Sequence, residues 1–216
     1  MTLGELQDRI LGWAGAEERQ PWLLEARRTW FARVGEPHEE DKSFELRMNG
    51  LLEHYVIEFR PDGVNSTLEL FLRDGGEGLT TDERAQVREL GRSRRALFEV
   101  RKIRPGLVEL EEIPGEARHE VVERRSLVAL AKGDILEARL LPHDGKLHFS
   151  RAFTYHPREV RKSILKEARR RAAAGADVGD DFLAQLSRMA LRLERYRNVR
   201  VESIYDFDAP PGRNAV

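Results

Sequence analysis

Five short runs of apolar and β-branched residues between residues 97 and 153 constrain the fold more than any other feature. Three of them follow one another and are separated only by Pro-Gly turns; they cover Leu97 to Ile103, Leu107 to Ile113 and Ala117 to Glu123. Each run mixes apolar residues with alternating charge, which is typical of strands that bury one face. The pattern predicts three consecutive antiparallel strands.

The last two runs form a further hairpin. They cover Asp134 to Leu141 and Leu147 to Phe153, and the turn His143-Asp144-Gly145-Lys146 joins them. Ser126 to Leu130 is a helical or irregular link between the third and fourth runs. Because five strands expose two edges unless the sheet closes, the pattern predicts a small antiparallel barrel, either OB-like or SH3-like.

Helical periodicity precedes and follows these strands. The pairs Thr2/Glu5 and Thr80/Glu83 have the spacing of capping boxes, and a new helix is expected from Pro157. The expected class is therefore α+β, with the small five-stranded barrel between an N-terminal helical region and a C-terminal helix pair. We divide the chain into a helical region (1–93), a barrel (94–156), a helical hairpin (157–208) and a tail (209–216).

Composition narrows the classes of function. The chain has no cysteine, which excludes disulfides, thiolate metal sites and cysteine nucleophiles. Its 37 basic and 38 acidic residues give a formal net charge of −1, so any electrostatic role must be local. No segment reaches the ~18 apolar residues of a membrane helix, and the start MTLGELQDRI lacks the features of a secretory signal. We expect a cytoplasmic protein without a membrane partner.

Two resemblances concern the strand region. The first rests on Arg92-Ser93, Leu97-Phe98-Glu99-Val100, Pro105-Gly106, Val122-Glu123-Arg124, Gly133-Asp134, Ala138-Arg139 and Phe149-Ser150. These residues resemble a region of uncharacterised bacterial proteins, some of which carry an SEC-C metal motif elsewhere. The resemblance covers one small barrel and implies no activity, and a chain without cysteine departs from any SEC-C pattern.

The second resemblance rests on the fourth and fifth runs. Lys132 to Arg139, followed by Asp144 to Ser150, looks like the closing hairpin of an S1-type OB domain. Such domains bind single-stranded RNA, so this resemblance implies a nucleic-acid partner.

Two segments of the sequence approach known catalytic or phosphate-binding motifs without completing them. His119-Glu120-Val121-Val122-Glu123 lacks the second histidine of a zinc-hydrolase helix and lies on an expected strand. Asp74 to Gly78 lacks the lysine of a phosphate-binding loop and is interpreted as a helix connection. We therefore predict no catalytic residue, no cofactor and no metal ligand, and the sequence favours a protein that is not an enzyme.

One group of charged residues stands out. Residues 151–200 hold 13 Lys and Arg but only 6 Asp and Glu. Many of these cations belong to the helix expected after Pro157, whose apolar side carries Val160, Ile164 and Ala168. The candidate residues for binding a partner or nucleic acid are Arg158, Arg161, Lys162, Lys166, Arg169 and Arg170.

Three functions are compatible with these patterns. The first is a non-enzymatic binding or adaptor protein, with a protein partner favoured by the near-neutral total charge. The alternatives are binding of RNA or single-stranded DNA through the barrel and the basic helix 158–171, and an enzyme of unrecognised type.

The absence of cysteine and of paired histidines at ligand spacing leads to one prediction. Protein purified without added metal is expected to contain no stoichiometric zinc or iron by elemental analysis. One equivalent of either metal that survives dialysis against a chelator would contradict it.

Overall fold

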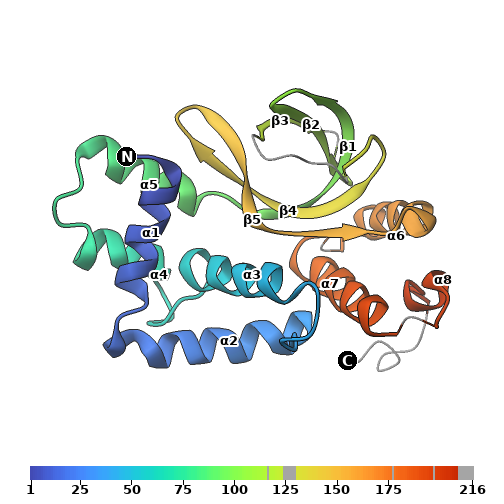
Figure 1. Cartoon of the computed structure of the whole chain (residues 1–216), viewed down its shortest axis with the longest axis horizontal. Coiled ribbons are helices and arrows are strands. Elements are labelled where there is room, and N and C mark those ends of the chain that lie inside the picture. Colours follow the sequence, from blue (N-terminus) through green and yellow to red (C-terminus); the bar gives the residue numbers. More distant parts are fainter. Residues whose placement is uncertain (116, 124–129, 177, 197, 209–216) are drawn as a thin grey trace.

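The computed structural model describes residues 1–115, 117–123, 130–176, 178–196 and 198–208. A small closed barrel lies between two sets of helices, as Figure 1 shows. The N-terminal helices lie beside and below the barrel in this view, and the C-terminal helices lie at its right-hand end. The expected α+β class, with a five-stranded barrel between two helical regions, is confirmed.

Helices α1 to α5 precede the barrel. They are α1 (Leu3–Ala14), α2 (Gln20–Val34), α3 (Phe44–Ile57), α4 (Thr67–Leu70) and α5 (Thr81–Gly91). A 3-10 turn (Glu17–Arg19) precedes α2, and a π-helical turn (Phe71–Gly75) extends α4. The capping boxes predicted at Thr2 and Thr80 begin α1 and α5. A third begins α4, where the Ser66 hydroxyl accepts from the Glu69 amide.

These helices share one apolar core. Leu6 and Ile10 of α1 pack against Tyr55 of α3. Phe71 of the π-helical turn and Val87 of α5 complete this core, and all five side chains are almost fully buried. The Tyr55 hydroxyl donates a hydrogen bond of 2.9 Å to the carbonyl at the end of α1. Because the hydroxyl has a partner, the ring is buried without leaving an unsatisfied polar group.

The strands are β1 to β5, at Arg95–Arg104, Leu107–Ile113, Arg118–Val122, Ile135–His143 and Lys146–His156. Their order around the closed barrel is β1-β2-β3-β5-β4. The β4–β5 hairpin turns at Asp144 and Gly145, which both have positive φ, as a primed two-residue turn requires. Side chains alternate across each strand, so Val100, Leu110 and Val121 point into the barrel and are fully buried.

The expectation of a wholly antiparallel barrel was wrong in one pair. β3 and β5 run parallel, with Val121 opposite Leu147 and Val122 opposite His148. The reason is geometrical, because strand direction cannot alternate all the way around a closed ring with an odd number of strands. One parallel pair is therefore required, and it falls where the β4–β5 hairpin returns to β3.

Three helices follow the barrel, after a 3-10 turn (Arg158–Val160). They are α6 (Arg161–Ala173), α7 (Asp180–Arg195) and α8 (Val201–Ile204). Ile164 of α6 and Phe182 of α7 pack on the outward side of the barrel, against Leu97 of β1 and Ile135 of β4. The outer face of the barrel at this end is thus buried beneath the C-terminal helices.

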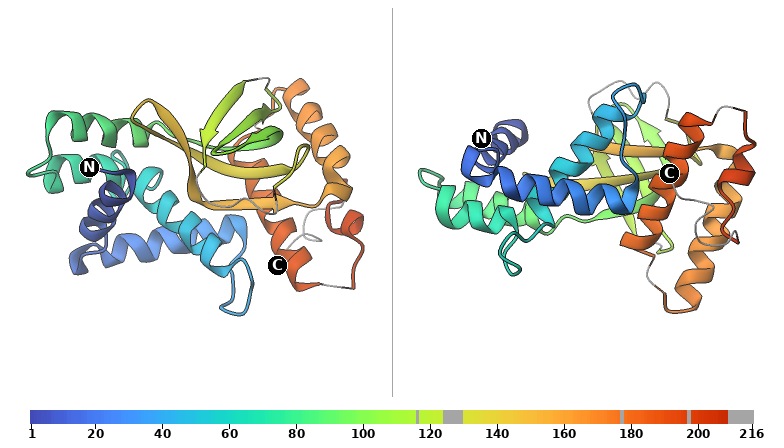
Figure 2. Two further views of the ribbon diagram at one scale, coloured as in Figure 1. Left: turned by 45° about the horizontal axis from the view of Figure 1, so that its top comes forward. Right: turned by 90° about the horizontal axis from the view of Figure 1, so that it is seen from below.

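Strand β4 is buried on both sides along most of its length. Leu136, Ala138 and Leu140 face the barrel interior, while the residues between them face the helices. Helix α3 lies against β5, and α5 lies against β4 (Figure 2). The hairpin β4–β5 therefore forms the wall between the barrel and the N-terminal helices.

Some expectations concern residues outside the described ranges. The predicted tail at 209–216 lies there, as does most of the link predicted from Ser126 to Leu130. In the part of the chain that the structure describes, none of the helices is both long enough and apolar enough to cross a bilayer.

The barrel interior gives a stability prediction. Leu110 on β2 is fully buried, so Leu110→Ala is expected to lower the free energy of unfolding by about 2 to 5 kcal/mol. Leu24 on α2 is 63% exposed and provides the control, because Leu24→Ala is expected to change stability by at most about 0.5 kcal/mol. Urea denaturation measures both, and equal effects of the two substitutions would show that the barrel interior is not packed as described.

Candidate functional site

The six predicted site residues lie at the C-terminal side of the barrel. Arg158 belongs to the 3-10 turn before α6 and therefore not to the helix itself, whereas the other five lie on α6. Val160, Ile164 and Ala168 are fully buried, as predicted for the apolar side of this helix. Because these apolar side chains are buried, the opposite side of α6 faces solvent.

Three of the six cations serve the fold by pairing with buried carboxylates. Arg158 contacts both oxygens of Asp134, at 2.5 and 3.1 Å. Arg161 donates a hydrogen bond of 2.7 Å to Glu99. Asp134 and Glu99 are only 6% and 4% exposed, so these arginines neutralise charges that would otherwise be costly to bury.

Arg170 is also paired within the chain. It binds Glu167 through two hydrogen bonds of 2.7 Å, and Arg171 reaches the same carboxylate at 2.8 Å. Both arginines hold the pKa of Glu167 below its usual range, with the hydrogen bonds from Arg170 as the largest cause. A cation whose charge is already matched in this way has less to gain from an external anion.

The other three cations form what we call the α6 stripe, consisting of Lys162, Lys166 and Arg169. All three are exposed and make no ion pair with any described residue. Their spacing of four and three residues places them on one face of the helix, one above the next. The structure thus brings together three of the six predicted residues as an exposed and uncompensated row of positive charge.

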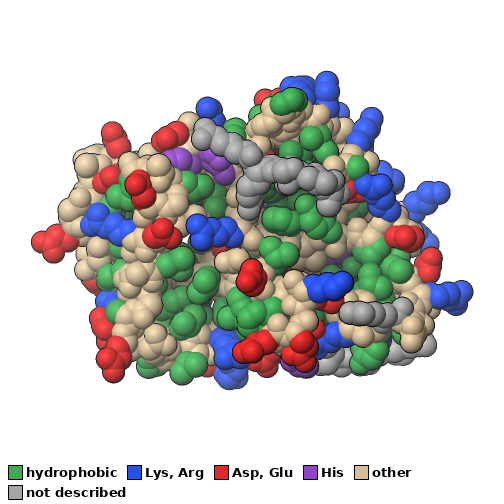
Figure 3. Space-filling view, viewed as in Figure 1, with side chains coloured by type: hydrophobic (Ala, Val, Ile, Leu, Met, Phe, Trp, Pro, Cys, Tyr) green, Lys and Arg blue, Asp and Glu red, His purple; other side chains and the backbone are tan. Residues whose placement is uncertain are grey.

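The wider surface shows the same separation of charge. In Figure 3, Lys and Arg side chains gather at the end of the molecule formed by α6 and the barrel. Asp and Glu side chains are frequent at the opposite end, over the N-terminal helices. The near-neutral total charge therefore conceals a positive and a negative end.

The outer side of β2 and β3 has a different character, because acidic residues dominate it. Glu109 and Glu120 lie opposite each other in the β2–β3 pair, and Arg104 approaches them at 3.6 and 3.5 Å. Glu111 has Arg118 at 3.5 Å. Each of these carboxylates has an arginine within the chain, so this face shows no excess of positive charge for a polyanion.

A buried network between the barrel and α3 was not among the predicted site residues. Its centre is Arg139 of β4, which is 2% exposed. Arg139 donates to Glu58, donates to the carbonyl of Ser93 at 2.7 Å and lies 3.5 Å from Glu53. Because an arginine stays charged inside a protein, it is tolerated here only with these acceptors around it.

The two carboxylates of this network titrate in opposite directions. Burial raises the pKa of Glu53 to about 7, and this outweighs the nearby charge of Arg139. Burial alone would also raise the pKa of Glu58. Hydrogen bonds from His54 and Arg139 and the charge of Arg139 more than offset that effect, so the pKa of Glu58 is about 2.

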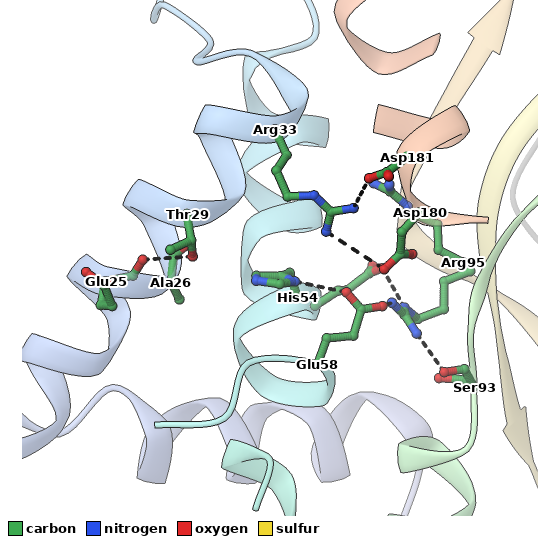
Figure 4. A network of polar contacts seen from close by, with 12 residues as sticks. Glu25, Ala26, Thr29, Arg33, His54, Glu58, Ser93, Arg95, Asp180 and Asp181 are labelled. Atoms are coloured by element: carbon green, nitrogen blue, oxygen red, sulfur yellow. Dashed lines mark hydrogen bonds and ion pairs between the residues drawn. The ribbon is translucent and has the colours of Figure 1, made fainter. Parts of the chain in front are cut away.

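Two further polar contacts are drawn in Figure 4, one at the C-terminal end of α3 and one between α2 and α7. His54 of α3 and Glu58, the residue that follows the helix, point toward each other and are 2.9 Å apart. Arg33 at the end of α2 lies 3.8 Å from Asp180 and 3.2 Å from Asp181 at the start of α7. The Arg33 contacts join α2 to α7, which lie far apart in the chain.

One feature of the sequence indicates that Arg139 is buried and paired. Arg139 is the one basic residue in the run Ile135 to Leu141, which is otherwise apolar except for Glu137. An isolated arginine within a buried strand needs a carboxylate partner. Its partners, however, come from a helix some 80 positions earlier, and no spacing rule connects the two segments.

The positions of the His, Asp and Glu side chains decide whether the described residues meet the requirements of a metal site. Within the described ranges, no three His, Asp or Glu side chains gather in a way that would hold a metal ion. His119, which the sequence analysis considered, lies 3.4 Å from Glu112 and packs edge-on against Phe98.

The raised pKa of Glu53 predicts a pH effect on stability. Folding raises this pKa from 4.5 to about 7, so the contribution is complete below pH 4.5 and is lost as the pH rises through about 7. Such a shift corresponds to about 3 kcal/mol. In denaturation experiments near pH 4.5 and above pH 7, Glu53→Gln is expected to remove this loss. Glu45→Gln, at an exposed position of the same helix, is the control and should keep the wild-type pH dependence.

The comparisons with known proteins give one positive result. Neither the curated proteins nor the solved structures yield a match to this chain. A family model described as a family of unknown function, DUF7986, matches residues 29–181. That range runs from α2 to the first turn of α7 and includes the barrel, Arg139 and the α6 stripe.

The match carries no SEC-C or OB description, so the two resemblances of the strand region stay interpretations. It covers about seven-tenths of the 216 residues. The chain belongs to DUF7986, a family of unknown function.

Proposed function

We propose that this is a non-enzymatic binding protein that docks an acidic protein partner along the α6 stripe. The observation that carries the proposal is the contrast within one short segment. Arg158, Arg161 and Arg170 are paired with carboxylates of the chain, whereas the stripe residues are exposed and pair with no carboxylate among the residues that the structure describes. In this proposal residues 157–208 form the docking unit, and residues 1–93 and 94–156 hold it in place.

The size of the stripe favours a protein over a nucleic acid. Three phosphate contacts would give a slope of only about −2 in a plot of log affinity against log salt for a single strand, which is small for a nucleic-acid-binding protein. The arginines on the outer side of β2 and β3 are matched by Glu109, Glu111 and Glu120, so that face offers no excess positive charge to a phosphate backbone. An acidic peptide can lie along α6 without approaching that face.

Binding of RNA or single-stranded DNA is the second candidate. Its support is the strand order β1-β2-β3-β5-β4 with one parallel pair, which is the order of OB-type barrels. OB-type barrels often bind single strands, although fold alone does not specify function. A strongly salt-dependent affinity for an oligonucleotide would favour this candidate.

Charge reversal on the stripe tests the proposal. The triple variant Lys162→Glu, Lys166→Glu, Arg169→Glu is expected to weaken binding of a labelled Glu-rich peptide by at least about tenfold, measured by fluorescence anisotropy. Its stability should change little, because each residue is exposed and unpaired.

The matched control carries the same change of charge elsewhere. Lys42, Arg88 and Lys146 are exposed and lie outside α6, and their replacement by Glu should leave peptide binding largely unchanged. Equal losses in the two triple variants would reduce the effect to net charge and refute the stripe. A labelled oligouridylate that binds more tightly than the peptide would replace the first candidate with the second.

A further inference from the structure

A cavity of about 110 Å³ lies between the N-terminal helices and the barrel. Its lining is mainly aliphatic and comes from α1, α3, α4, α5, β4 and β5; representative aliphatic residues are Ile10 and Leu11 of α1, Val56 and Ile57 of α3, Leu90 of α5 and Leu141 of β4. Apolar side chains also come to the surface between α1 and α3 (Figure 3). A largely aliphatic lining with a few polar groups is the usual composition of a site for a small ligand.

The polar lining of this cavity includes one positive charge that no residue in the described ranges neutralises. Arg151 of β5 is exposed, lines the cavity and makes no ion pair with any described residue. The other charged group in the lining is Glu53, which has Arg139 at 3.5 Å and accepts from the amide of Ala152 at 3.3 Å. Glu53 is therefore occupied, and Arg151 remains available to an anion.

The position of Arg151 results from an irregularity in the sheet. The register of β4 and β5 shifts between Ala138 and Leu140, opposite the segment that contains Arg151. In this segment the Ser150 hydroxyl bonds both to the amide and to the carbonyl of Ala152. Bulges of this kind redirect a side chain from its regular place on the strand.

We propose that this cavity binds a small aliphatic carboxylic acid, with the alkyl chain among the leucine and isoleucine side chains and the carboxylate on Arg151. An arginine with free donors fits a carboxylate with two parallel hydrogen bonds. An apolar cavity of ~150 Å³ holds one benzene molecule. At about 110 Å³ this cavity is smaller than that, so it encloses only part of an alkyl chain, and the rest of the ligand lies at the open side where Arg151 is exposed.

Octanoate is the probe for the test, and octylammonium, with the same chain length and the opposite charge, is the matched ligand control. The methyl signals of the Leu, Ile and Val residues that line the cavity are expected to shift on titration with octanoate. Octylammonium is expected to bind at least about tenfold more weakly. Equal affinities for the two ligands, or the absence of shifts at these methyl groups, would overturn the proposal.

Protein variants separate the charge from the cavity. Arg151→Gln should weaken octanoate binding by at least about tenfold, whereas Arg88→Gln, an exposed arginine on α5, should leave it unchanged. Leu52→Trp fills the cavity and should abolish binding, with thermal unfolding used to show that the variant is folded. Wild-type affinity in Arg151→Gln, or in folded Leu52→Trp, would refute the site.

Discussion

The pairing of Arg139 with Glu58 is the interaction on which the arrangement of the molecule depends. Arg139 lies on the strand that is buried on both sides, and its charge cannot be removed by deprotonation. It therefore requires carboxylate and carbonyl acceptors at fixed positions, and α3 supplies the carboxylates. Loss of one partner of such a buried pair typically costs about 3 to 5 kcal/mol. The barrel and the N-terminal helices are thus joined by a contact that tolerates little displacement.

The outward-facing residues of β4 contact the C-terminal helices at the start of the strand and the N-terminal helices at its end. Ile135 packs with α6 and α7, and Glu137 accepts from Ser187 of α7 at 3.0 Å and pairs with Arg95 at 3.2 Å. Arg139 meets α3, and Leu141 enters the core of the N-terminal helices. One strand with alternating apolar and charged residues therefore positions both sets of helices.

Both proposed sites lie at the edges of this arrangement. The cavity with Arg151 lies where β5 leaves the regular register beside α3, so its shape depends on how the Arg139 contacts hold α3 against the hairpin. The α6 stripe faces outward because Val160 and Ile164 are buried and because Arg161 is held by Glu99. In both places, cations needed by the fold are paired and the candidate binding cations are not.

Local patterns were enough to predict the two helical regions, the five strands and the buried side of α6, because periodicity and turn residues act over a few positions. Pairing of the cations was decided only by the tertiary structure. Arg161 and Lys162 are neighbours with similar charge, yet Glu99 of a distant strand binds the first, while the second is exposed and pairs with none of the described carboxylates. The partners of Arg139, the parallel β3–β5 pair and the position of Arg151 likewise arise from contacts between remote segments, which no local spacing encodes.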